Sequence, residues 1–153
     1  MAKAIYNPAL ASVDDISATS ATFLIEPLHP GYGNTLGNSL RRVLLSSVRG
    51  GAVVAFRIEG ATHEFTTVEG IKEDVVDIML NLKNVHLHVF TDDPVELRIE
   101  KSGAGEVTAA DIKTNADIEV VNPEQVIATI DDPNKHLVMD LVVEAGCGYQ
   151  TIE

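Results

Sequence analysis

Alternation of apolar and polar side chains predicts short strands along most of the chain. Residues 21–28 place Phe23 and Ile25 on one face until Pro27 ends the pattern. The segment 52–59 alternates in the same way. Five further segments of this kind, separated by turns rich in Asp, Asn, Gly and Pro, are 85–90, 94–100, 117–121, 125–130 and 136–144.

Two segments have the period of a helix instead. Residues 34–48 follow a glycine-rich loop, and 67–83 carry one apolar stripe that begins after Thr66 and Glu69, which fit a capping box. Many short strands with few helices predict an α+β protein with mostly antiparallel sheets and two main helices.

The first predicted helix has two unlike sides. At about 100° per residue, one side gathers an apolar stripe formed by Leu36, Leu40, Val43, Leu44 and Ser47. Leu45 lies on the opposite side, and the polar residues around it are Asn38, Arg41, Arg42 and Arg49. This arrangement is either a lone surface leucine beside solvated arginines or an apolar anchor rimmed by arginines, which is typical of a protein interface.

The glycines before this helix raise a rival hypothesis, a nucleotide- or phosphate-binding enzyme. Gly31, Gly33 and Gly37 would form the loop, and Arg41 or Arg42 the anion clamp. The spacing fits poorly, because the third glycine of a dinucleotide fingerprint comes one residue late and no Gly-Lys-Ser/Thr follows. A structural alternative is that Gly31 and Gly33 turn the chain and that Asn34 or Thr35 caps the helix.

Composition narrows the function classes further. The chain has 153 residues, 45% of them hydrophobic, and a formal net charge of −12, which disfavours nucleic acid as the main ligand. Its apolar runs are short and its first residues do not form a secretory signal, so a cytoplasmic protein is expected. The single cysteine, Cys147, is interpreted as an incidental thiol.

Other candidate chemistry is weak. His86 and His88 share a strand face without a third metal ligand, and the polar face of an amphipathic strand explains them, as surface exposure explains His29, His63 and His136. The acidic pairs before prolines, at 92–93 and 131–132, are interpreted as turn formers. No catalytic residue, metal or cofactor is predicted.

Three motifs give the sequence a family resemblance. They are "EPLHPGYGNTLGNSLRRVLLSSVRG" (26–50), "HEFTTVEGIKEDVVDIMLNLKNV" (63–85) and "KSGAGEVTAADI" (101–112). The chain closely resembles the amino-terminal domain of the bacterial RNA polymerase alpha subunit. The resemblance implies a cytoplasmic, non-catalytic assembly subunit whose homodimer holds the beta and beta-prime subunits, without membrane or direct nucleic acid contact from this segment.

The resemblance also implies two interleaved α+β lobes. Residues 1–50 would begin the dimerisation lobe, and 51–153 would belong to an inserted, mostly β lobe. Family members continue beyond the position of "GCGYQTIE", so both lobes are expected to be incomplete in this truncated chain. The contacts that the family makes through its later parts, with beta-prime, DNA and activators, are therefore not assigned here.

Site residues follow from the same resemblance. The dimer contact would include Tyr32, Leu36, Val43 and Ser47, which belong with Leu40 to the apolar side of the first helix. Arg42 and Leu45 would face the beta subunit, with Asn38, Arg41 and Arg49 nearby.

Overall fold

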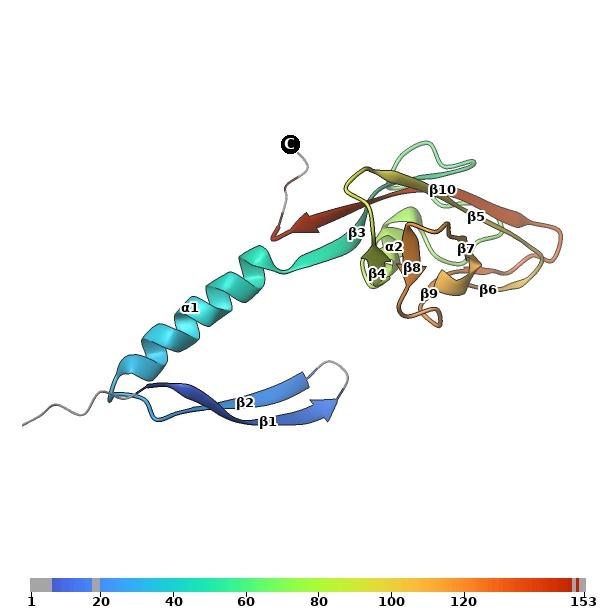
Figure 1. Ribbon diagram of the computed structural model, residues 1–153. Coiled ribbons are helices and arrows are strands. Elements are labelled where there is room, and N and C mark those ends of the chain that lie inside the picture. The colour runs from blue at the N-terminus through green and yellow to red at the C-terminus, as the bar shows by residue number, and fades with distance from the viewer. Residues whose placement is uncertain (1–6, 18–19, 150, 152–153) are drawn as a thin grey trace, which may run out of the picture. The chain divides into compact units, whose positions relative to one another are not determined.

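The computed structural model describes residues 7–17, 20–149 and 151, and it divides the chain into two compact units (Figure 1). The first unit is Met1–Ser47 and the second is Val48–Glu153. All strand pairs are antiparallel among the described residues, which contain two α-helices. The predicted α+β class is therefore confirmed.

The first unit consists of a hairpin and a helix. Strand β1 (Ala9–Ser17) pairs with β2 (Ser20–Glu26), and α1 (Tyr32–Ser47) follows. The helix begins two residues before the predicted position 34, because Gly31 turns the chain at φ +84° and Tyr32 N–H donates to the His29 carbonyl at 2.9 Å. None of the described residues in this unit is buried.

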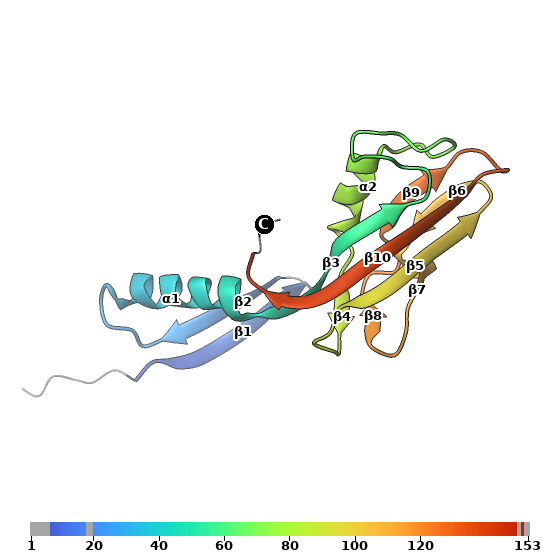
Figure 2. The ribbon, with the colours of Figure 1, turned by 90° about the horizontal axis from the view of Figure 1, so that it is seen from above.

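The second unit is built on a six-stranded sheet in the order β7-β5-β10-β3-β4-β8, with a separate pair, β6-β9 (Figure 2). The long strand β10 pairs with β3 on one side and β5 on the other. The elements are β3 (Arg49–Ile58), α2 (Val75–Leu82), β4 (Leu87–Val89), β5 (Val95–Ser102), β6 (Gly105–Thr108), a 3-10 turn (Ala109–Asp111), β7 (Ile112–Lys113), β8 (Ile118–Val120), β9 (Val126–Ile130) and β10 (His136–Cys147).

One hydrophobic core joins α2 to both sheets of the second unit. Alternate residues of β5 are buried, as the period of a half-buried strand requires. Asn81 on α2 donates its side-chain N–H to the Ile127 carbonyl at 3.0 Å, which ties the helix to β9. The largest fully buried side chains are Ile78, Ile99, Ile127, Ile130, Leu137, Met139, Leu141, Val107 and Val143.

The helix predicted over 67–83 is shorter in the structure. It begins only after Asp74, whose carboxylate accepts the Asp77 N–H at 2.6 Å as an N-cap, so the Thr66–Glu69 capping box was wrong. The preceding residues run as irregular backbone because Gly70 has φ +83° and its carbonyl accepts the Asp131 N–H at 2.9 Å. Ile71 is nevertheless buried. The apolar spacing before Asp74 therefore predicted burial correctly, although the predicted helix was wrong there.

A half-buried ion pair closes the segment "KSGAGEVTAADI". Lys101 Nζ lies 2.7 Å from Asp111 Oδ2 and 2.7 Å from the Glu106 carbonyl oxygen, and Asp111 Oδ2 also accepts the Thr108 N–H at 2.8 Å. Burial alone would raise the pKa of the Asp111 carboxyl, but the hydrogen bonds from Lys101 and Thr108 outweigh burial and lower that pKa.

We expect Asp111→Asn to lower the free energy of unfolding by about 1 kcal/mol at pH 7, because the amide keeps the shape but loses the charge that attracts Lys101. A lowered pKa in the folded state means that the unfolded chain binds the proton more tightly. The carboxylate's contribution is therefore complete above a pH of about 4 and is lost as the pH falls through the folded-state pKa. The free energies of unfolding of the parent and the variant should therefore approach each other as the pH falls. Urea unfolding of both proteins from pH 7 to pH 2 measures this, and a difference that stays the same at every pH would contradict the prediction.

Candidate functional site

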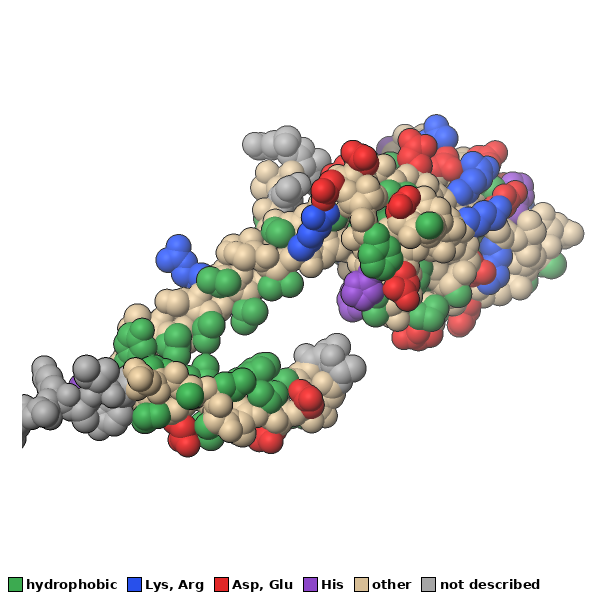
Figure 3. Space-filling view, viewed as in Figure 1, with side chains coloured by type: hydrophobic (Ala, Val, Ile, Leu, Met, Phe, Trp, Pro, Cys, Tyr) green, Lys and Arg blue, Asp and Glu red, His purple; other side chains and the backbone are tan. Residues whose placement is uncertain are grey.

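Helix α1 exposes apolar side chains on the side that carries the stripe. Leu40, Val43 and Leu44 are exposed, Val43 by 57%, and Leu36 is half-buried. Figure 3 shows hydrophobic side chains of α1 on the side that faces the hairpin. The hairpin itself exposes Leu10, Val13, Phe23 and Leu24. Exposed apolar surfaces of this kind are typical of interaction sites.

The opposite side of α1 carries Leu45, which is 65% exposed. Asn38, Arg41 and Arg42 are also exposed on the helix. Within the described part of the chain, the guanidinium groups of Arg41 and Arg42 form no ion pair or hydrogen bond, although the Arg42 carbonyl accepts the Ser46 hydroxyl at 2.7 Å. Both guanidinium groups can therefore bind an acceptor on another molecule.

Arg49 does not belong to this helix, contrary to the sequence-based interpretation. The helix ends at Ser47, and Arg49 begins β3, where it pairs with Cys147 of β10. Its guanidinium forms an ion pair with Asp92 and donates to the Thr91 carbonyl at 3.2 Å. The strand register therefore places Arg49 in the second unit, with its charge already compensated.

The three glycines do not form one loop. Only Gly31 has a positive φ among them, because Gly33 and Gly37 lie inside α1. Asn34 and Thr35 are likewise helical residues and not the expected caps. The backbone that would have had to cradle a phosphate is thus committed to the helix, which removes the structural basis of the nucleotide-binding hypothesis.

The described residues were compared with the requirements of a metal site and of a membrane-spanning helix. His88 lies opposite Glu119 on neighbouring strands, but no group of three His, Cys, Asp or Glu side chains is placed to hold a metal ion in residues 7–17, 20–149 and 151. Neither helix of this described part is long and apolar enough to span a bilayer.

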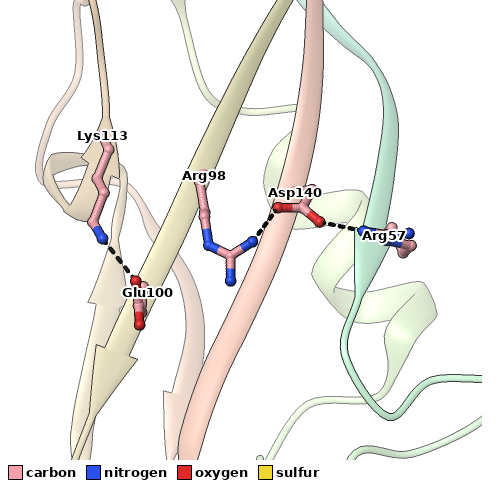
Figure 4. Close-up of polar contacts among 5 residues, drawn as sticks. All are labelled: Arg57, Arg98, Glu100, Lys113 and Asp140. Carbon is pink, nitrogen blue, oxygen red and sulfur yellow. Dashed lines mark hydrogen bonds and ion pairs between the residues drawn. The ribbon is translucent and has the colours of Figure 1, made fainter.

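A network of ion pairs extends over four strands of the second unit, β3, β10, β5 and β7 (Figure 4). Asp140 on β10 accepts from Arg57 on β3 at 2.8 Å and from Arg98 on β5 at 2.9 Å, and Lys113 reaches Glu100 at 2.8 Å. The hydrogen bond from Arg57 lowers the pKa of the Asp140 carboxyl. Asp140 is half-buried, but its partners are exposed, so the pairs add little stability. Sequence reasoning missed the network because its members are far apart in the chain.

Phe65 is a second feature that sequence reasoning missed. Its side chain is 80% exposed, on a turn closed by the Thr66 N–H and the His63 carbonyl at 3.3 Å. Thr66 in turn accepts the Val75 N–H at 3.2 Å. An exposed aromatic residue on a fixed turn is a candidate protein contact. Its signal in the sequence was a large apolar residue between polar ones in "HEFTT".

Comparison with known proteins shows where this chain belongs. Residues 54–153 match the family described as the RNA polymerase Rpb3/RpoA insert domain. A DNA-directed RNA polymerase subunit alpha from Alkaliphilus metalliredigens (strain QYMF) is 51% identical over 136 residues, which are 89% of this chain and 43% of that protein. The DNA-directed RNA polymerase subunit alpha of Leifsonia xyli subsp. xyli (strain CTCB07) is 52% identical over 136 residues, which are 89% of this chain and 41% of that protein.

A third relative extends the match slightly. The DNA-directed RNA polymerase subunit alpha of Rubrobacter xylanophilus is 50% identical over 141 residues, 92% of this chain and 45% of that protein. The chain thus spans roughly two fifths of the length of these curated relatives. The resemblance to RNA polymerase alpha subunits is thus confirmed, and the chain belongs to the family of the RNA polymerase Rpb3/RpoA insert domain, which it matches over residues 54–153.

Proposed function

We propose that this chain is a non-catalytic assembly segment of bacterial RNA polymerase, which acts through the two sides of α1. The observation that carries the proposal is that Val43 and Leu45 are both exposed on one helix, although they point to nearly opposite sides. A single partner surface cannot cover both sides of a straight helix. Two separate protein contacts are therefore the arrangement that would bury them.

The apolar side of α1 is the proposed dimer contact. The residues proposed for this contact are Tyr32, Leu36, Leu40, Val43 and Ser47. Burying a leucine or valine side chain fully contributes about 1.5 to 3 kcal/mol, so covering this side by a second alpha subunit would stabilise both copies. The length of α1, 16 residues, supports this role, because it presents the stripe over four turns.

The arginine side is the proposed contact for the beta subunit. Leu45 would be the apolar anchor, Arg42 the main donor, and Asn38 and Arg41 its neighbours. In a chain of net charge −12, two uncompensated arginines on one helix favour a partner surface that offers carboxylates or carbonyl oxygens. Arg49 was expected beside them and stays a weaker candidate, because Asp92 already binds its guanidinium.

The wider assembly is proposed from the resemblance to RNA polymerase alpha subunits. We infer that a homodimer of such subunits holds the beta and beta-prime subunits, and that this segment itself touches neither DNA nor membrane. For a component of bacterial RNA polymerase, we propose a cytoplasmic location.

We expect Arg42→Ala to weaken binding of the beta subunit at least tenfold. A hydrogen-bonded arginine at an interface contributes about 2 kcal/mol or more, and alanine removes all of its donors. Affinity for the purified beta subunit of the same polymerase measures the loss. Arg57→Ala is the matched control, because Arg57 is also exposed but lies on β3 of the second unit. Unchanged beta binding by Arg42→Ala, with an unchanged circular dichroism spectrum, would remove the docking role.

A glutamate introduced on one side of α1 or on the other distinguishes the two proposed contacts. In an alpha subunit of the relatives' full length that begins with this sequence, Val43→Glu should raise the dimer dissociation constant at least tenfold, because a carboxylate cannot be buried unpaired. Leu45→Glu should leave dimerisation unchanged and weaken beta binding. Sedimentation velocity at micromolar concentration measures the first effect. Equal loss of dimer in both variants would contradict a two-sided helix.

A further inference from the structure

No further inference is drawn: the strongest candidate, the groove of about 630 Å³ on the outer face of strands β3, β10 and β5, is lined by the Arg57–Asp140–Arg98 ion pairs, and nothing in the structure shows what covers it.

Discussion

Replacing Ile78 with alanine should lower the free energy of unfolding of the second unit by about 2 to 5 kcal/mol. Ile78 lies at the centre of α2 with 0% of its side chain exposed, within the core that the helix shares with both sheets. Alanine removes three buried carbon atoms and leaves a cavity that the rigid neighbouring strands cannot fill. Urea denaturation followed by circular dichroism, extrapolated to zero denaturant, measures the change.

Leu80→Ala is the matched control for this substitution. Leu80 lies two residues further along the same helix and is 50% exposed, so helix propensity changes in a similar way while little buried volume is lost. We expect a change below about 1 kcal/mol. If the two variants unfolded at the same urea concentration, α2 would not be packed as the structure describes.

Replacing Gly51 with alanine should also destabilise the second unit, by about 3 kcal/mol. Gly51 lies on β3, where it pairs with Leu87 of β4. A methyl group at this position would overlap Val89 Cγ2 and would lie 2.8 Å from the Leu87 carbonyl oxygen. Because one of these neighbours is backbone, β4 would have to move away from β3. Thermal and urea unfolding of the variant measure the loss.

The neighbouring glycine supplies the control. A methyl group on Gly50 would meet no heavy atom within 4 Å, so Gly50→Ala should change the stability by no more than about 0.5 kcal/mol. Both substitutions alter the unfolded chain equally, which leaves the contact with β4 as the difference. Tolerance of alanine at both positions would contradict the close approach of β3 and β4.

These stability variants complement the binding variants on α1. Ile78 and Gly51 belong to the second unit, whereas Arg42, Val43 and Leu45 are exposed on a helix without a buried residue. We therefore expect substitutions at the α1 positions to change binding with little effect on unfolding of the second unit. The assembly role then depends on a surface helix, and the sheet unit supplies an independent core.

Local pattern was sufficient for most regular elements. Each segment predicted as a strand contains one, because a half-buried strand needs only alternation over a few residues. Strands β1, β6 and β7 were not predicted. In β1, Asp14 and Asp15 interrupt the alternating pattern, and pairing with β2 stabilises the strand instead. The helix over 67–83 was overextended, because apolar spacing cannot reveal that Gly70 takes a positive φ.

The sequence by itself determined the fold class, the family and the two-sided pattern of α1, because each depends on short motifs or on helical periodicity. Only the tertiary structure decided which distant residues meet. Arg49 joins Asp92, and Asp140 lies between Arg57 and Arg98, since strand register brings together side chains that are 42 to 83 positions apart. Register depends on pairing across the whole sheet and on burial of one face, so no local pattern specifies it.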